Sequence, residues 1–368
     1  MKKTVLLLGA GKIGRMIARL LMDSGDYIVR VGDAFEDALA RLQERVPTVE
    51  TRVVDATSIS DLESAMQGCE AVISALSFRF NANVAQAALT SGISYFDLTE
   101  DVATTRAVRA IAEHAKPGQV FVPQCGLAPG FVGIVASDLA SWFDELESVR
   151  MRVGALPEFP TNALTYNLTW STDGLINEYC NPCDAIYEGR RIELLPLEGL
   201  EHFALDGVHY EAFNTSGGLG SLCDTFNGKV NELNYKTIRY PGHQALMQFL
   251  LRDLRLDRRR ELLKDVLEAA IPLTFQDVVV VFCTVTGRRR GQFVQKSDAR
   301  KIYPQTMNGE VWSAIQLTTA SAVCAVMDLL LAETNPRHGF IRQEEIGLEP
   351  FLANRFGKLY ESAHQPVT

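Results

Sequence analysis

The stretch Gly9-Ala-Gly-Lys-Ile-Gly14 decides the fold, because it joins an apolar run to an amphipathic helical pattern. The residues before it are Val-Leu-Leu-Leu (5–8), and the pattern that begins inside it reads IGRMIARLLMDSG (13–25). In a G-x-G-x-x-G pattern the first glycine permits a tight turn, the second lets the backbone approach a pyrophosphate, and the third lets helix and strand pack closely. Unpaired N–H groups at the start of the helix attract phosphate. The stretch therefore predicts a strand–turn–helix unit that binds a dinucleotide.

An acidic residue after the next apolar run indicates which dinucleotide is bound. Asp33 ends that run, 19 residues beyond Gly14. A carboxylate at this position accepts hydrogen bonds from the adenosine ribose hydroxyls and repels a 2′-phosphate. Ala34, not an arginine, follows it, so we expect NAD in preference to NADP. The expected cofactor contacts lie in the glycine loop or just after predicted strands: Gly9, Gly11, Lys12, Ile13, Gly14, Asp33, Asp55, Ala56, Ala75 and Leu76.

The first 130 residues alternate short apolar runs with helical patterns. The predicted strands are Thr4–Leu8, Tyr27–Val31, Glu50–Val54, Ala71–Ala75, Ser94–Leu98 and Val120–Pro123. The predicted helices between them include Ile13–Ser24, Phe35–Arg45, Asn81–Ser91 and Thr104–Ala115. Strands joined by crossovers of helix length predict a parallel, doubly wound α/β sheet.

After Gly130 the strand-like runs become longer and alternate in polarity, which predicts an α+β domain with a mainly antiparallel sheet. The predicted strands are Ser148–Gly154, Ala163–Trp170, Val230–Arg239 and Asp277–Thr286, with a hairpin through Gly287–Gly291. The predicted helices are Asp173–Tyr179, His243–Leu254, Arg259–Ala270 and Val311–Ala332. We therefore expect three parts: a dinucleotide-binding domain at 1–130, a substrate domain at 131–310, and a helix and tail at 311–368 that pack back on the first domain.

Composition narrows the classes of protein that remain. The chain has 368 residues, which favours two domains, and a net charge of −9, which argues against a nucleic-acid partner. Seven cysteines at irregular spacing and the lack of a signal-peptide pattern predict a cytoplasmic protein. The apolar run Ala314–Ala332 contains Gln316 and Asp328, so we expect a buried helix and no membrane partner. Cys180 and Cys183 form an isolated C-x-x-C pair, and we expect no metal there.

Four further segments carry a resemblance to a known family. They are Cys125-Gly-Leu-Ala-Pro-Gly130, Tyr166-Asn-Leu-Thr-Trp-Ser171, Glu211-Ala-Phe-Asn-Thr-Ser-Gly-Gly218 and Tyr235-Lys-Thr-Ile-Arg-Tyr-Pro-Gly-His243. With the glycine motif, they make nearly all of the chain resemble the saccharopine dehydrogenase-like family, most closely its lysine 6-dehydrogenase branch. The resemblance implies a Rossmann domain, a substrate domain and oxidation at a carbon that bears nitrogen. By family habit it also implies a homodimer or higher homo-oligomer.

The segment Lys236–His243 holds the main candidates for substrate chemistry. The guanidinium fork of Arg239 suits a substrate α-carboxylate, and His243 is the side chain best suited to act as general base. The other candidates are Lys236 for a carboxylate, Thr215 in a donor-rich loop, Trp170 as a wall of the site and Asp97 for a substrate ammonium.

Each candidate has a plainer alternative. Arg239 and Lys236 suit a surface ion pair or a solvated strand, and His243 suits the first turn of a helix. Thr215 suits a hairpin corner, Trp170 a core position and Asp97 a turn.

The sequence thus predicts an NAD-dependent oxidoreductase acting on a C–N bond of a small amino-acid substrate, with lysine 6-dehydrogenation favoured. Saccharopine oxidation or reduction is the alternative within the family, which also includes carboxynorspermidine formation. A non-catalytic NAD-binding regulator is the alternative of a different class.

Overall fold

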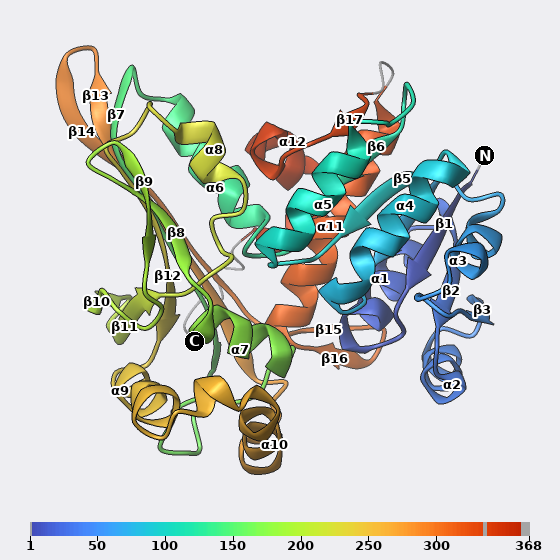
Figure 1. The fold of residues 1–368 in the computed structure, drawn as a ribbon, viewed down its shortest axis with the longest axis horizontal. Coiled ribbons are helices and arrows are strands. Elements are labelled where there is room, and N and C mark those ends of the chain that lie inside the picture. Colours follow the sequence, from blue (N-terminus) through green and yellow to red (C-terminus); the bar gives the residue numbers. More distant parts are fainter. Residues whose placement is uncertain (1, 334–336, 362–368) are drawn as a thin grey trace. The chain divides into compact units, whose positions relative to one another are not determined.

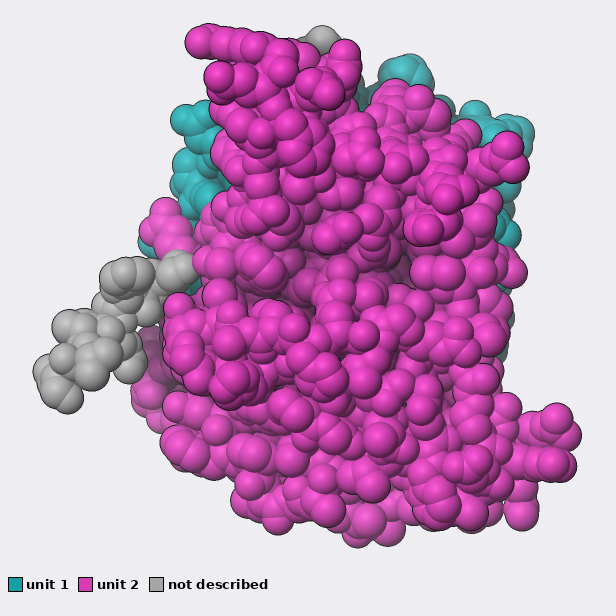
Figure 2. Space-filling model, turned by 90° about the vertical axis from the view of Figure 1, so that its left-hand side faces the viewer, with its two compact units in different colours: residues 1–131, 318–359 teal, residues 132–317, 360–368 magenta. Residues whose placement is uncertain are grey.

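The chain folds into two compact units, drawn as a ribbon in Figure 1 and coloured separately in Figure 2. The computed structural model describes residues 2–333 and 337–361. Unit 1 comprises residues 1–131 and 318–359, and unit 2 comprises residues 132–317 and 360–368. One division between the units therefore falls inside the helix α11 (Ala314–Ala332), between Leu317 and Thr318.

Unit 1 is built on a seven-stranded sheet in which every neighbouring pair is parallel, in the order β17-β6-β5-β4-β1-β2-β3. The strands are β1 (Lys3–Leu8), β2 (Tyr27–Asp33), β3 (Glu50–Val53), β4 (Ala71–Ser74), β5 (Ser94–Asp97), β6 (Val120–Val122) and β17 (Gly339–Phe340). The six strands predicted from the apolar runs are confirmed. Strand order reverses on the two sides of β1, and the carboxyl ends at such a reversal are where doubly wound sheets bind ligands.

Helices connect the strands of this sheet. They are α1 (Lys12–Asp23), α2 (Glu36–Arg45), α3 (Ile59–Met66), α4 (Asn81–Ser91) and α5 (Val102–Ala112). The predicted helices are confirmed, whereas α3 was not predicted. Its signal is the N-cap Ser58, whose side chain accepts a hydrogen bond from the Asp61 N–H.

The end of the chain returns to unit 1. β17 adds to the sheet beside β6, with Gly339 in register with Val120. Asp328, on α11, accepts a hydrogen bond from the Tyr27 hydroxyl at 2.6 Å and pairs with Arg355 at 2.7 Å. Helix α11 is long and apolar enough to span a bilayer, but 78% of its most apolar window is buried. Residues after 361 lie outside the described part of the chain.

Unit 2 contains an eight-stranded mixed sheet with the main order β10-β11-β12-β7-β13-β14, while β8 pairs with β12 and β9. Only the β12–β7 pair is parallel among these described strands, so the expected mainly antiparallel sheet is confirmed. The bounds are β7 (Glu145–Pro157), β8 (Cys183–Tyr187), β9 (Arg190–Leu194), β10 (Glu201–Leu205), β11 (Val208–Asn214), β12 (Glu232–Arg239), β13 (Asp277–Arg289) and β14 (Gln292–Ile302). A separate two-stranded sheet consists of β15 (Gln305–Met307) and β16 (Glu310–Trp312).

The helices of unit 2 precede, connect or follow these strands. They are α6 (Phe131–Ser141), α7 (Thr172–Cys180), α8 (Leu222–Phe226), α9 (His243–Gln248) and α10 (Arg260–Ala270). Figure 1 shows α7, α9 and α10 gathered at one end of the sheet. Their apolar faces and the inner face of β11 form one core, which includes Tyr166, Tyr179, Phe213, Met247 and Leu263. This core surrounds the polar cluster described below.

One strand predicted for unit 2 was wrong, two predicted helices differ in detail, and β8 to β11 were not predicted. Ala163–Trp170 forms no strand, because Tyr166, Leu168 and Trp170 pack into the core beside α7, and only an isolated bridge joins Leu168 to Leu273. The helix predicted for His243–Leu254 changes after Gln248 to a π-helical turn (Phe249–Asp253). The helix predicted from Val311 begins at Ala314, because Val311 lies in β16.

The predicted hairpin through Gly287–Gly291 is confirmed. β13 runs to Arg289 and β14 starts at Gln292, so the turn consists of Arg290 and Gly291. Both residues have positive φ, 49° and 78°, as a tight two-residue hairpin turn requires.

Candidate functional site

The glycine loop of unit 1 has the shape that a dinucleotide requires. Gly9 has φ of 105°, and its N–H donates to the Gly32 carbonyl at 2.8 Å. A Cβ on Gly9 would lie 2.8 Å from the Ala75 oxygen, and a Cβ on Gly14 would lie 1.9 Å from the Gly9 oxygen. A Cβ on Gly11 would meet nothing within 4 Å. The first and third glycines are thus required by packing, while the space at the second is open to a pyrophosphate.

Asp33 is held at the carboxyl end of β2 by two backbone donors. Its Oδ2 accepts from the Ala10 N–H at 2.7 Å, and its Oδ1 accepts from the Phe35 N–H at 3.0 Å. The side chain is partly exposed, and each carboxylate oxygen keeps a further lone pair. The loop and the carboxylate are therefore fixed relative to each other, and this donor and acceptor set fits NAD(P).

The other expected cofactor residues lie beside the glycine loop or after neighbouring strands. Lys12 and Ile13 form the first turn of α1, Ala75 and Leu76 follow β4, and Asp55 and Ala56 follow β3. Asp55 also has a local role, because the Thr57 hydroxyl and N–H donate to it at 2.7 and 2.8 Å and lower its pKa. The parallel sheet thus gathers all of these segments at one edge of unit 1.

Asp97 positions loops, in place of the substrate contact expected from the sequence. It is fully buried at the end of β5, and its carboxylate accepts from the Tyr95 hydroxyl at 2.6 Å, the Thr99 N–H at 2.9 Å and the Gln124 N–H at 3.0 Å. Burial raises the pKa of Asp97. Gln124 has φ of 65°, so one task of the carboxylate is to hold a backbone conformation that L-residues rarely adopt.

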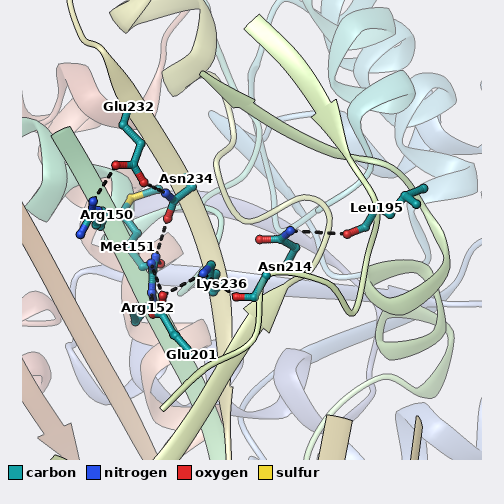
Figure 3. A network of polar contacts seen from close by, with 10 residues as sticks. Arg150, Met151, Arg152, Leu195, Glu201, Asn214, Glu232, Asn234 and Lys236 are labelled. Atoms are coloured by element: carbon teal, nitrogen blue, oxygen red, sulfur yellow. Dashed lines mark hydrogen bonds and ion pairs between the residues drawn. The ribbon is translucent and has the colours of Figure 1, made fainter. Parts of the chain in front are cut away.

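In unit 2, the alternation of side chains along β12 separates residues that are adjacent in sequence. Tyr235, Thr237 and Arg239 face the inner core, whereas Lys236 faces the opposite side of the sheet. There the Lys236 ammonium donates to the Gly199 carbonyl at 2.6 Å and pairs with Glu201 at 2.8 Å (Figure 3). The sequence had suggested that Lys236 and Arg239 share one site, but the structure places them on opposite faces of the sheet.

On the face of the sheet that carries Lys236, three basic residues pair with carboxylates. Arg152 bonds the Glu201 carboxylate through two nitrogens, and Arg150 pairs with Glu232 at 2.6 Å (Figure 3). Glu201 thus accepts from both Lys236 and Arg152, which lower its pKa although burial opposes them. These cations stabilise the sheet and are not available to a substrate.

Arg239 is a buried cation with one free nitrogen. Its Nε donates to the Tyr179 hydroxyl at 2.9 Å, and its Nη1 donates to the Thr237 hydroxyl at 2.9 Å and the Ile238 carbonyl at 2.8 Å. Within the described chain, Nη2 has no hydrogen-bond partner. Burial lowers the pKa of Arg239, but the hydroxyls of Tyr179 and Tyr166 and the carboxylate of Glu178 outweigh burial and keep it above its ordinary value. Arg239 thus offers a ligand a single nitrogen and a full charge, and not the parallel fork expected from the sequence.

His243 is buried beside Arg239 with a fixed proton. Its Nδ1 lies 2.8 Å from the Leu164 carbonyl oxygen, which can only accept, so Nδ1 carries the hydrogen. Its Nε2 then accepts from the Tyr179 hydroxyl at 3.0 Å. Burial and, secondly, the Arg239 charge lower the pKa of His243 to about 3. The lone pair that a general base needs is occupied, so the geometry gives His243 a positioning role.

Four buried oxygens of unit 2 lack hydrogen-bond partners among the described residues. Among the described residues, six buried side-chain polar atoms are unpartnered, and four of them are Tyr166 Oη, Asn167 Oδ1, Thr169 Oγ1 and Thr215 Oγ1. An unsatisfied buried group costs about 1–3 kcal/mol. The Tyr166 ring lies 4.9 Å from the Arg239 guanidinium carbon. Unit 2 therefore contains buried oxygens that no described residue satisfies, as expected if a polar ligand binds there.

Thr215 and Trp170 flank the cluster. The register that pairs Phe213 with Thr237 continues toward Thr215 opposite Tyr235, and a Cβ on Gly218 would lie 2.4 Å from the Tyr235 ring. The 215–218 loop thus packs on that ring. Trp170 is half-buried and packs on α7, where a Cβ on Gly174 would lie 2.3 Å from its ring.

Two functional residues were missed from the sequence. Tyr179 bonds both Arg239 and His243, but a buried tyrosine on a helix looks like any core residue before its partners are known. Glu211 accepts from the N–H groups of Gly242 and Gln244 at 2.8 and 2.6 Å, and so fixes the turn that carries His243. Its signal was its place at the start of the E-A-F-N-T-S-G-G segment.

Comparison with known proteins finds two family matches. Residues 5–122 match the saccharopine dehydrogenase NADP binding domain, and residues 126–359 match the saccharopine dehydrogenase C-terminal domain. The yeast Saccharomyces cerevisiae saccharopine dehydrogenase (L-Glu forming), in its apo structure, has a TM-score of 0.75 at 17% identity, over 97% of this chain and 96% of that chain. This likeness shows a shared fold.

The curated relatives are longer proteins. The mitochondrial alpha-aminoadipic semialdehyde synthases of Mus musculus and Rattus norvegicus are each 21% identical over 309 residues, which is 80% of this chain and 32% of the relative. The chain thus spans about a third of the length of the curated relatives it matches.

The open space at Gly11 gives a prediction that separates binding from folding. In Gly11→Ala the added methyl group touches nothing in the protein, so the melting temperature should stay unchanged. The same methyl group should obstruct a pyrophosphate and weaken NAD(P) binding by about 10-fold or more. Gly14→Ala is the contrasting variant, because its methyl group collides with the Gly9 oxygen and should lower the melting temperature as well. Calorimetry with and without dinucleotide measures both effects, and unchanged affinity in Gly11→Ala would contradict the loop assignment.

The low pKa of His243 gives a prediction for stability against pH. An unfolded histidine has a pKa near 6.5, whereas the pKa of folded His243 is about 3, so unfolding below pH 6.5 takes up a proton. This contribution to stability is complete above pH 6.5 and falls by about 1.4 kcal/mol per pH unit as the pH drops toward 3. His243→Gln should lose this slope. Urea unfolding of both proteins between about pH 4 and pH 7 measures the difference, and equal slopes would mean that His243 titrates normally.

Proposed function

The chain belongs to the saccharopine dehydrogenase family and is an NAD(P)-binding dehydrogenase of it, and we propose that it oxidises a C–N bond of an amino acid. The proposed substrate is L-lysine, attacked at the ε-carbon, with NAD as the cofactor. Saccharopine is the second candidate, supported by the names of the matching family models and of the similar yeast structure, a saccharopine dehydrogenase.

The observation that carries the proposal is the unpartnered Nη2 of Arg239. A guanidinium that is 3% exposed and bonded through its other two nitrogens has a fixed direction, and Nη2 is the part left for a ligand. A substrate α-carboxylate supplies the negative charge that this buried cation lacks in its hydrogen bonds, and such charge-assisted bonds are worth about 1.5–3 kcal/mol. The Thr215 hydroxyl is buried without a hydrogen-bond partner in the described chain and supplies a further polar group for the amino-acid head group.

The residues of this chain contribute binding and orientation. Arg239 holds the carboxylate, which fixes the distance to the side-chain amine of lysine. The rings of Tyr166 and Tyr179 lie 4.9 and 5.8 Å from the guanidinium carbon. In unit 1, Asp33 and the glycine loop hold the dinucleotide. The nicotinamide, when bound, supplies the hydride acceptor. Loss of a hydride and a proton leaves an imine, which water converts to a semialdehyde and ammonia, and the semialdehyde cyclises.

The distribution of charge favours lysine over saccharopine. Saccharopine carries more carboxylates than lysine and would need more cations around Arg239. Lys236, the nearest candidate in sequence, is bonded to Glu201 on the other face of β12. A substrate with one carboxylate therefore fits the described inner face of unit 2 better.

The direct test is to follow reduction of the nicotinamide by absorbance with purified protein, NAD or NADP, and either lysine or saccharopine. The proposal expects reduced dinucleotide with lysine and NAD. A signal with saccharopine alone keeps the chemistry and changes the substrate. Silence with both, despite measurable dinucleotide binding, would overturn the proposal in favour of another imine-type substrate or a non-catalytic NAD-binding regulator.

A matched pair of variants tests which face of β12 meets the substrate. Arg239→Ala should lower kcat/KM for the amino acid by roughly 10- to 100-fold, as expected for loss of a charged hydrogen bond, with little change in dinucleotide affinity. Lys236→Met removes a cation three residues away on the opposite face and should change kcat/KM less than about 3-fold, since exposed or paired charges contribute little. A large effect of Lys236→Met on KM would contradict the assignment of faces.

Asp33 should set the choice of dinucleotide. Asp33→Ala removes the charge that repels a 2′-phosphate, so the ratio of NADP to NAD affinity should rise by about 10-fold or more. Titration of the dinucleotides by intrinsic fluorescence measures the ratio. A ratio equal to that of the wild type would remove Asp33 from the ribose site.

A further inference from the structure

We propose that Tyr179 and His243 form a hydrogen-bonded relay that holds Arg239 in one orientation, and that both are positioning residues for recognition of the substrate carboxylate. The inference rests on the proposed function and deepens it. It assigns a role to Tyr179, which no sequence pattern indicated, and replaces the role of general base for His243.

The first step is an account of donors and acceptors. The Leu164 carbonyl accepts from His243 Nδ1, which leaves Nε2 as an acceptor. Nε2 lies 3.0 Å from the Tyr179 oxygen, so the Tyr179 hydroxyl donates to it. The Tyr179 oxygen keeps lone pairs and accepts from Arg239 Nε at 2.9 Å. One arrangement of protons satisfies every member of the relay, and it runs from the guanidinium to a backbone carbonyl.

The second step is the effect of the relay on the guanidinium. Thr237 Oγ1 and the Ile238 carbonyl bind Nη1, and Tyr179 binds Nε from the other side of the planar group. A plane held at two of its three nitrogens cannot rotate without breaking a bond. The third nitrogen, Nη2, therefore points in a fixed direction with both of its hydrogens unpaired among the described residues. Loss of the Tyr179 hydroxyl would release one side of the plane.

The third step is the rigidity of the support. Tyr179 lies on α7, and His243 is the first residue of α9. The Phe213 ring stacks on the imidazole at 6.3 Å and 9°, and the Tyr166 ring meets it edge-on at 5.4 Å. Glu211 fixes the backbone on both sides of His243 through Gly242 and Gln244. The relay is thus tied to β11, β12, α7 and α9, which makes it a built feature and not a chance contact.

The relay works only with a neutral imidazole. A proton on Nε2 would turn this nitrogen into a donor facing the Tyr179 oxygen, which already accepts from Arg239. The Tyr179 hydrogen would then have no acceptor in the relay. Arg239, Tyr166 and Tyr179 lie against the ring, and the Glu211 carboxylate binds the N–H groups of the residues before and after His243. The positive charge of Arg239 opposes protonation of the ring.

Steady-state kinetics with matched variants test the relay. Tyr179→Phe should raise KM for the amino acid about 10-fold while kcat falls less than about 3-fold, because positioning of the carboxylate is lost and the reacting groups are unchanged. His243→Leu should act like Tyr179→Phe, whereas His243→Gln, whose amide both accepts and donates, should recover part of the loss. Tyr210→Phe is the control: Tyr210 is as buried as Tyr179 but lies on β11, facing the side of the sheet opposite Arg239, so it should behave as wild type.

The outcomes separate positioning from general damage. Dinucleotide affinity should stay unchanged in every variant, and an equal loss of dinucleotide and substrate binding would overturn the proposal as a folding effect. An unchanged KM in Tyr179→Phe would overturn it outright.

A spectroscopic test needs no turnover and so remains decisive if the proposed function fails. In ¹⁵N spectra, His243 should show the neutral Nδ1–H form from about pH 5 to pH 8, while an exposed histidine titrates near 6.5. The Arg239 Nε–H signal should exchange slowly with water in the wild type and quickly in Tyr179→Phe. If His243 titrates near 6.5, or if Arg239 Nε–H is unaffected by Tyr179→Phe, the relay is wrong whatever the enzyme acts on.

Discussion

The burial of one positive charge organises the functional part of unit 2. A guanidinium removed from water must have nearly all of its N–H groups bonded, because each unsatisfied charged donor is costly. Arg239 meets this demand at Nε and Nη1, through a tyrosine, a threonine and its own strand's carbonyl, and His243 in turn holds the tyrosine. Nη2 is the exception, and we propose that the negatively charged group of a ligand binds there.

The alternation of side chains along β12 places its two basic residues on opposite faces of the sheet. Lys236 and Arg239 stand three residues apart in the segment K-T-I-R-Y-P-G-H, yet the two-residue period of a strand sends them to opposite faces. On its face, Lys236 shares Glu201 with Arg152, and the charges cancel within the sheet (Figure 3). On the other face, Arg239 donates hydrogen bonds to uncharged groups, and the carboxylate that raises its pKa is Glu178. Basic residues that cluster in the sequence therefore divide between the two faces of the sheet, and only Arg239 lies on the face where we propose that the substrate binds.

The candidate residues of unit 1 divide in a similar way. Asp33 is partly exposed beside the glycine loop. Asp97, also at a strand end, is buried and accepts hydrogen bonds from three donors inside the protein. Both positions look alike in sequence, as an acidic residue after an apolar run. The difference comes from the loops after β5 and β6, which close over Asp97 and use its carboxylate to hold Gln124 at positive φ.

The sequence by itself determined the parallel sheet, its helices and the dinucleotide loop, because each rests on local periods and on glycines whose steric needs are local. It also indicated Arg239 and the segment around it. Only the tertiary structure decided that Ala163–Trp170 forms no strand, that Tyr179 joins Arg239 to His243, and that Lys236 faces away. These outcomes depend on contacts between residues that lie tens of positions apart in the chain. Which hydrogen bonds a side chain makes, and which face of a strand is buried, is decided only when those residues come together.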